Sequence, residues 1–188
     1  MARRVLGIDP GLTRCGIAVL EVASNRSLKF IAVETATTMA ATPLAERIER
    51  IGSVIEQQII EHRPDLVAIE RVFAQANLRS VMGVAQISGV VLWLCAKHKI
   101  QVQFHTPSEV KSAVTGNGRA NKQQVGTMVA KLLGLQEIPK PADSADALAI
   151  AITAGWRPEP IDSDVRGGGS ELTKAQKAWA SALRASKK

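Results

Sequence analysis

The sequence has few cysteines and no long uninterrupted apolar run. Its two cysteines, Cys15 and Cys95, each lie in an apolar stretch with no second cysteine or histidine at the spacing of a metal site. We expect buried thiols and neither a disulfide nor a zinc site. Runs such as residues 89–96 fall short of the roughly 20 residues that cross a bilayer. Residues 1–4 do not resemble a signal peptide, so we expect a soluble, cytoplasmic protein without membrane attachment.

Acidic residues are also scarce relative to basic ones. The net charge of +7 and the pI near 9.8 favour a polyanionic partner. One stretch, residues 97–122, has a single acid, Glu109, against five basic residues: Lys97, Lys99, Lys111, Arg119 and Lys122. This stretch is a candidate phosphate-binding face, although an ordinary solvated surface has the same composition.

Hydrophobic patterning predicts a mixed sheet flanked by helices. Three strands over residues 4–9, 13–22 and 28–37 form an antiparallel meander, and an amphipathic helix then begins at Pro43 and ends before Pro64. Further strands are predicted over 66–70 and 100–105, with helices over 78–97, 107–114, 121–133 and 142–154. The helix over 78–97 is apolar nearly all round, so we expect it to be covered by the core or by a second subunit.

The composition changes near the end of the chain. After Arg157 the residues are rich in proline and glycine, including a run of three glycines at 167–169. Such a segment can bury little apolar surface. We therefore expect one folded domain over residues 1–157 and a flexible basic tail over 158–188.

Four acids stand where a functional site would form. Asp9 and Glu70 each end a short apolar strand, and ligands of sheets with helical crossovers bind at that end. Asp143 and Asp146 lie three residues apart near the start of the last predicted helix, and hence on one face of it. We expect the four carboxylates to converge on one site.

Crowded carboxylates favour a metal site. They repel one another and raise one another's pKa unless cations neutralise them. Oxygen ligands select hard ions, which indicates Mg²⁺, with Mn²⁺ as a substitute. Two such ions about 3.5–4 Å apart support phosphodiester cleavage. Taken singly, each acid has another explanation, as a turn former or as a residue that offsets a helix dipole. Their combined placement in a basic chain favours metal.

Two loops add candidate DNA contacts. Phe73 lies three residues after Glu70 in a polar loop, where an exposed aromatic ring stacks on an unpaired base with about 1–3 kcal/mol, or else packs into the core. The glycines around Asn117 allow a close phosphate approach or a simple connection. His105 follows a strand and fits a core histidine as well as a functional one.

Three ordered motifs resemble the RuvC family of bacterial Holliday junction resolvases. They are Gly7-Ile8-Asp9-Pro10-Gly11, residues 68–73 and residues 142–149. The similarity runs from about Arg4 to Trp156 and includes residues 106–111 and 116–122 in the same order. No part of the chain after Arg157 resembles the family core.

This resemblance implies an RNase H-like fold with a mixed five-stranded sheet, and a homodimer that nicks opposing strands of a four-way DNA junction symmetrically. It implies that two Mg²⁺ or Mn²⁺ ions per active site are held by Asp9, Glu70, Asp143 and Asp146. Some relatives carry histidine at the position of Asp143. The further residues expected at the DNA are Lys111, which is also a candidate for proton transfer, Lys122, Phe73, Arg79 and Arg119. A branch-migration motor is the partner that the family suggests.

Three other functions stay open. An ATP-binding protein of the actin and sugar-kinase class also uses an aspartate, glycines and a threonine in a hairpin, but it needs two such domains. A junction-binding protein without catalysis would rely on the basic surface alone. A nuclease of the same fold acting on an RNA–DNA hybrid would use the same acids.

Overall fold

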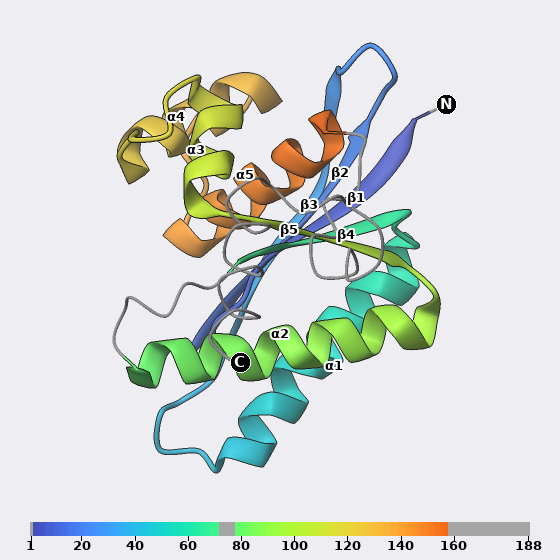
Figure 1. The fold of residues 1–188 in the computed structure, drawn as a ribbon, viewed down its shortest axis with the longest axis vertical. Coiled ribbons are helices and arrows are strands. Elements are labelled where there is room, and N and C mark those ends of the chain that lie inside the picture. The colour runs from blue at the N-terminus through green and yellow to red at the C-terminus, as the bar shows by residue number, and fades with distance from the viewer. Residues whose placement is uncertain (1, 72–77, 158–188) are drawn as a thin grey trace, which may run out of the picture.

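The structure is a computed structural model, and it describes residues 2–71 and 78–157, with side chains for 2–71 and 81–157. Its centre is a five-stranded sheet of order β3-β2-β1-β4-β5 (Figure 1). The strands are β1 (Arg3–Asp9), β2 (Arg14–Val22), β3 (Leu28–Thr37), β4 (Leu66–Glu70) and β5 (Gln101–His105). β1, β2 and β3 are antiparallel, whereas β4 runs parallel to β1 and β5 parallel to β4. The predicted mixed sheet is confirmed.

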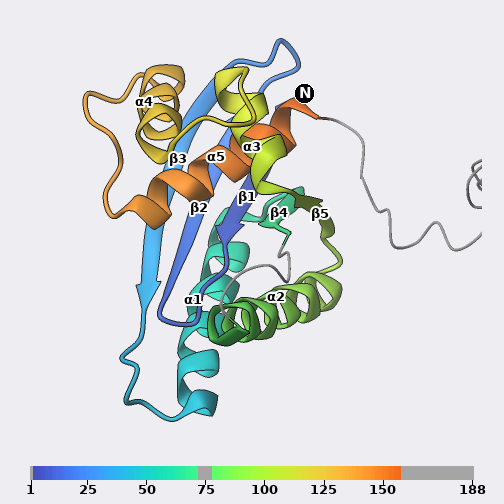
Figure 2. The ribbon, with the colours of Figure 1, turned by 60° about the vertical axis from the view of Figure 1, so that its left-hand side comes forward.

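Helices cover both faces of this sheet. α1 (Leu44–His62) and α2 (Leu78–His98) lie on one face, and α3 (Pro107–Thr115), α4 (Lys122–Leu133) and α5 (Ala142–Trp156) lie on the other (Figures 1 and 2). Each predicted helix and strand is present within a few residues of its expected bounds. The predicted tail over residues 158–188 lies outside the described residues, so it stays a prediction.

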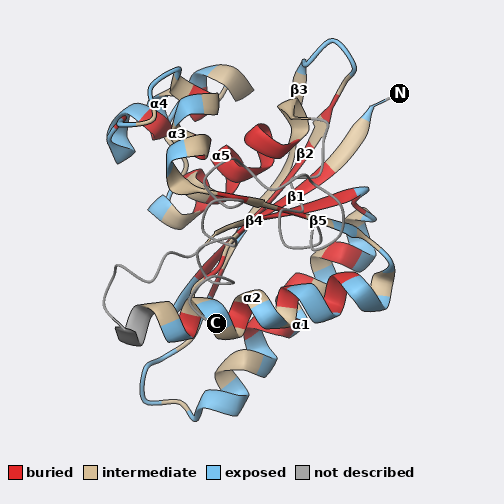
Figure 3. Cartoon of the chain, viewed as in Figure 1, coloured by how far each residue is buried: buried red, intermediate tan, exposed pale blue. Residues whose placement is uncertain are grey.

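Two hydrophobic cores separate the sheet from its two helical layers. Successive side chains of a strand point to opposite faces of the sheet. In β1, Val5 therefore packs in the core on the side of α5, whereas Leu6 and Ile8 pack in the core on the side of α1 and α2. Both cysteines are buried, as expected, in the core between the sheet and the helices α1 and α2. Burial raises the pKa of each thiol to about 12. The central strands are thus buried on both sides (Figure 3).

The helix α5 is the most enclosed element. Its residues from Ala147 to Ala154 are all buried, and Gly7 of β1 lets it lie close to the sheet, since a β-carbon there would come within 2.8 Å of the Ala151 side chain. The sheet covers one side of α5, and α3 and α4 cover another (Figure 2). A helix without a polar stripe is stable in water only when covered in this way.

Among the described residues, the equally apolar helix α2 is covered on one side only. Ile87, Val91 and Leu94 are buried against the sheet. The opposite face forms what we call the α2 stripe, whose members are exposed and lie within roughly 100° of one another on the helix: Met82, Ala85, Gly89, Leu92, Trp93 and Ala96. Trp93 is 61% exposed and Met82 55%. The residues that the structure describes therefore cover one face of α2 and leave the opposite face exposed.

The helix α2 is long and apolar enough to pass a test for membrane-spanning helices, although it contains no long uninterrupted apolar run. Val81–His98 has a mean hydropathy of 1.3 over 18 residues, enough by length and composition to cross a membrane. Small and polar residues interrupt the apolar ones in this segment, so its high mean hydropathy does not appear as one uninterrupted apolar run. One face of the helix belongs to the core, however, and core helices of soluble proteins pass the same test. This window is weak evidence for a membrane span.

Candidate active site

Two of the four predicted acids end neighbouring strands. β1 and β4 are paired in parallel with Ile8 opposite Ile69, so Asp9 and Glu70 follow directly at the same edge of the sheet. Each carboxylate is partly buried because its strand lies in the middle of the sheet. The shared register thus brings together two acids that stand 61 residues apart in the chain.

The other two acids reach this edge through the start of α5. Gly16 of β2 makes the approach possible, because a β-carbon at this position would collide with the backbone oxygen of Asp143. The hydroxyls of Thr35 and Ser144, 3.0 Å apart, join β3 to the first turn of α5. Asp143 and Asp146, one helical turn apart, are therefore held over the ends of the strands. We call Asp9, Glu70, Asp143 and Asp146 the acidic cluster.

Two basic side chains pair with the cluster. The Lys122 ammonium donates to Oδ2 of Asp146 at 2.9 Å, and Nε of Arg14 lies 3.2 Å from Oδ2 of Asp143. Lys122 is the first residue of α4, whose start is held by a capping box between Asn121 and Gln124. Each acid of α5 therefore has its own cation.

The pKa shifts identify the cluster as one electrostatic unit. Burial, and then the charges of Glu70, Asp146 and Asp143, raise the pKa of Asp9 to about 7, while Lys122 opposes the rise. Burial and the charge of Asp146 also raise the pKa of Glu70, against the charges of Lys122 and Lys111. The hydrogen bond to Asp146 raises the pKa of Lys122. The acids thus carry an excess of negative charge that the two lysines offset only in part.

The donor chemistry fits a hard divalent ion. All four ligand candidates are carboxylates, and their mutual repulsion is what a bound cation would relieve. Among residues 2–71 and 81–157, no three acidic, histidine or cysteine side chains are yet grouped closely enough to hold a metal. Arg14 and Lys122 hold the α5 carboxylates instead. For a metal to bind more than two of the acids, the carboxylates of α5 must therefore rotate away from Arg14 and Lys122 and toward Asp9 and Glu70.

Lys111 approaches from α3. A capping box between Thr106 and Glu109 begins this helix, with the Glu109 amide donating to the Thr106 hydroxyl at 3.2 Å. The charge of Lys111 lowers the pKa of Glu70, which places it close enough to act on the cluster. Glycines at the end of α3 and in the following turn, including Gly116 at φ 76°, lead the chain back to Lys122.

The remaining predicted residues lie apart from the cluster or outside the description. Arg119 is exposed between α3 and α4, and its charge is not among those that shift the pKa of Asp9 or Glu70. Phe73 lies outside the described residues. Arg79 belongs to the first turn of α2, and its side chain is not among those that the structure describes. Their predicted DNA contacts remain predictions.

His105 is a core residue. Its position on β5 lies opposite Glu70 of β4 in the register of the sheet, and its side chain is fully buried. Burial lowers its pKa, so the imidazole is neutral near pH 7. Of the two interpretations left open by the sequence, this favours the structural one.

Arg14 is a candidate functional residue that the sequence analysis missed. It stands two residues before Gly16 on β2, so both positions share the face that α5 approaches. A basic residue at that spacing before the close-contact glycine was the available signal. Its side chain is 62% exposed, and hence accessible to a ligand as well as to Asp143.

Comparisons with known proteins are consistent and cover most of the chain. A family model described as crossover junction endodeoxyribonuclease RuvC matches residues 5–154. The chain is 50% identical to the protein of that name from Clavibacter michiganensis subsp. michiganensis over 196 aligned residues, 97% of each chain. It is 52% identical to the one from Renibacterium salmoninarum over 176 residues, 94% of this chain and 90% of the relative.

Solved structures agree in fold. The structure of Thermus thermophilus RuvC in complex with a Holliday junction substrate superposes with a TM-score of 0.76 and 35% identity, covering 80% of this chain and 92% of that one. The yeast mitochondrial Holliday junction resolvase, 16% identical with a TM-score of 0.55, covers 81% of this chain and 78% of its own, and shares the fold alone.

Proposed function

The chain belongs to the RuvC family of crossover junction endodeoxyribonucleases, and we propose that it resolves four-way DNA junctions by nicking two opposing strands symmetrically. Within the RNase H-like fold, the acidic cluster lies at the edge of the sheet where β1 and β4 both end, and this position supports its assignment as the reactive site. The observation that carries the proposal is the convergence of four carboxylates, on three separate elements, in a chain of net charge +7.

Metal binding falls to the acidic cluster in this proposal. Asp9, Glu70, Asp143 and Asp146 would hold Mg²⁺, or Mn²⁺ in its place, as two ions per active site. When bound, such ions supply an activated water and neutralise charge on the leaving oxygen. The pKa of Asp9, raised to about 7 without a cation, supports this assignment, because a cation would favour its ionised form.

The lysines of α3 and α4 bind the DNA backbone. Lys122 bonds to Asp146 and lies in the field of Asp9 and Asp143, so it is placed for a phosphate at the cluster. Lys111 approaches Glu70 from the other helix and is the candidate for holding the proton of the leaving group. Arg119, Arg79 and Phe73 would extend the contact along the junction arms, with Phe73 stacking on an unpaired base.

Symmetric cutting requires two active sites, and the α2 stripe supports a homodimer. Its exposed apolar side chains include Met82, Leu92 and Trp93, and the early turns of the helix share a pocket with the loop that follows Asp9. An exposed apolar face of this kind is typical of an interaction site. A second copy of the chain would cover it and complete the protection of α2. We further infer a cytoplasmic location, and a branch-migration motor as the functional partner.

One experiment separates the resolvase from its alternatives. The full chain is incubated with labelled four-way junction, linear duplex and RNA–DNA hybrid, each with Mg²⁺ and with chelator. We expect paired, symmetric and ligatable nicks in the junction only, and only with the metal. Cutting of the hybrid alone would favour the related nuclease. Junction binding without cutting under any metal would favour the non-catalytic protein, and tight, competable ATP binding would favour the kinase-like class.

A further inference from the structure

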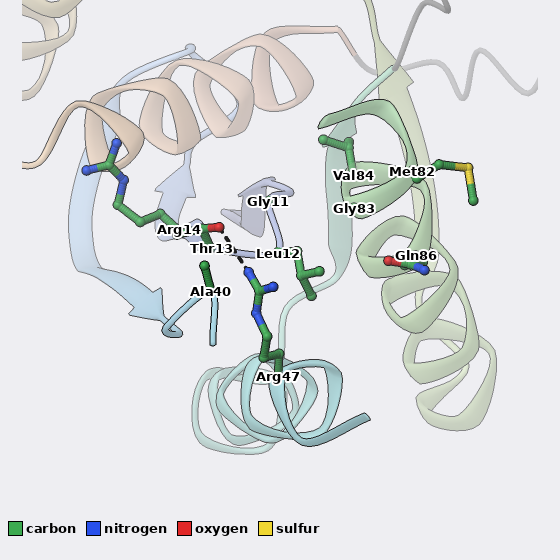
Figure 4. Close-up of a pocket in the computed structure, with 10 residues that line it drawn as sticks. All are labelled: Gly11, Leu12, Thr13, Arg14, Ala40, Arg47, Met82, Gly83, Val84 and Gln86. Carbon is green, nitrogen blue, oxygen red and sulfur yellow. Dashed lines mark hydrogen bonds between the residues drawn. The ribbon is translucent and has the colours of Figure 1, made fainter. Parts of the chain in front are cut away.

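A pocket of about 680 Å³ lies next to the loop that follows Asp9, on the side of this loop that faces α1 and α2. The loop residues Gly11 to Arg14 form one wall, with Arg47 of α1 below (Figure 4). The other wall comes from α2 and consists of Met82, Gly83, Val84 and Gln86. The volume falls within the roughly 300–1,000 Å³ typical of pockets for small ligands. Its position beside the acidic cluster makes it accessible to a molecule already bound there.

The lining has basic but no acidic residues. It contains Arg14 and Arg47, together with an apolar wall that includes Leu12 and Val84. Arg14 extends away from the pocket centre toward α5, where it meets Asp143 (Figure 4). Arg47 is therefore the cation left to the pocket itself.

Arg47 is held in place without being neutralised. Its Nε donates to the Thr38 hydroxyl and its Nη2 to the Thr13 hydroxyl, both at 3.0 Å. Among the described residues it forms no ion pair with a carboxylate. Two neutral acceptors fix a guanidinium without cancelling its charge, and such a group is prepared for an anion.

We propose that this pocket binds one nucleotide of the cleaved DNA strand next to the scissile phosphate, with its phosphate on Arg47 and its base against the apolar wall. The inference rests on the proposed function and adds a subsite to it. A DNA strand that runs from the acidic cluster toward α1 and α2 must cross the Gly11 to Arg14 loop. Arg47 is the positive charge that this DNA strand would meet in the pocket beyond the loop.

The salt dependence of junction binding tests the charge on Arg47. Binding is measured with chelator present, so that no strand is cut, for wild type, Arg47→Gln and Arg63→Gln. Arg63 is an exposed arginine at the opposite end of α1 and is the matched control. We expect Arg47→Gln to bind roughly tenfold more weakly, with the slope of log affinity against log salt reduced by about 0.7–0.9. Arg63→Gln should keep the wild-type slope, and Arg47→Lys should restore it.

A neutral phosphate identifies the contact in the DNA. Junctions carrying a single methylphosphonate are scanned along the positions that flank the cut. One position should weaken binding by wild type and have no further effect on Arg47→Gln, because a lost contact cannot be lost twice. Additive losses at every position would overturn the proposal.

Other outcomes also decide the matter. If Arg47→Gln keeps the affinity and slope of wild type, or loses thermal stability with the slope unchanged, Arg47 only fastens the loop and the proposal fails. If it instead changes the oligomeric state, the pocket is a contact between copies, which also overturns the proposal. Failure of wild type to bind or cut any junction would refute the proposed function itself, a result that the Arg47 variants cannot mimic.

Discussion

The helices α5 and α2 have similarly apolar sequences but opposite surroundings. α5 is enclosed by the sheet, α3 and α4, and its only acids, Asp143 and Asp146, lie near its start and reach the candidate active site. α2 is buried along one face and leaves the α2 stripe exposed. Within the described residues, the helix that brings two acids to the candidate active site is therefore covered on all its apolar sides, whereas α2 keeps one apolar face exposed.

The largest expected effect concerns the chemistry at α5. Asp146→Asn keeps the side-chain shape but removes the charge that Lys122 and a metal would share. We expect junction nicking to fall at least about 10³-fold, about 4 kcal/mol in activation free energy, with junction binding nearly unchanged. Single-turnover cleavage and binding assays measure both, with Glu49→Gln on the surface of α1 as the control. Equal losses of binding and cutting would indicate misfolding and not a lost ligand.

The acidic cluster should also make stability depend on pH. The pKa of Asp9 is raised from 3.8 to about 7 in the folded protein, so the folded state binds this proton more tightly than the unfolded chain. The stabilisation by Asp9 is complete below about pH 4 and is lost as the pH rises to about 7. In metal-free buffer, Asp9→Asn should therefore gain about 4 kcal/mol relative to wild type between pH 4 and pH 8. Denaturant unfolding at both pH values measures this, and a difference independent of pH would contradict it.

Two glycines allow a matched test of packing on the two sides. Gly16→Ala places a methyl group against the backbone of Asp143, whereas nothing lies within 4 Å of a β-carbon at Gly89 in the α2 stripe. We expect Gly16→Ala to lower the free energy of unfolding by about 1–3 kcal/mol and to impair cleavage. Gly89→Ala should stabilise the isolated fold by about 0.5–1 kcal/mol. Similar effects of the two changes on unfolding would contradict the difference in packing.

The α2 stripe should matter for assembly more than for folding. Trp93 is 61% exposed, and the ammonium of Lys97 lies 5.2 Å from the centre of its ring. Trp93→Glu should change the free energy of unfolding of the monomer by no more than about 0.5 kcal/mol but convert a dimer into a monomer. Light scattering coupled to gel filtration measures the mass. A stable dimer in this variant would place the interface elsewhere.

The smallest expected effect is at Arg14. Because its side chain is 62% exposed, its ion pair with Asp143 is worth about 0–1 kcal/mol. Removing this cation in Arg14→Gln should strengthen Mn²⁺ binding a few-fold, since the metal no longer competes with it for Asp143. Calorimetric titration of the metal measures the change, with Arg63→Gln as the control for net charge. Weaker Mn²⁺ binding would mean that Arg14 instead orients Asp143 for the metal.

The sequence alone predicted most of the fold and the members of the acidic cluster. Short apolar strands ending in Asp9 and Glu70 and a helix opening with two acids are local patterns, and strand and helix periodicity is legible without tertiary contacts. The assignment of these acids to junction cleavage depended on the resemblance of whole motifs. The pairing of Arg14 with Asp143 escaped prediction because it joins residues 129 positions apart.

Local sequence thus determined the elements, the order in which acids and lysines occur, and the basic character of the chain. The tertiary structure alone decided which face of α2 stays exposed and that the pKa of Asp9 is about 7. It also decided that Arg47 lies at a pocket where no carboxylate of the described residues pairs with it. The reason is physical: periodicity depends on neighbours three or four residues away, whereas burial and electrostatic fields depend on everything nearby in space. For α5 the described part of the chain supplies these surroundings, and for the α2 stripe it does not.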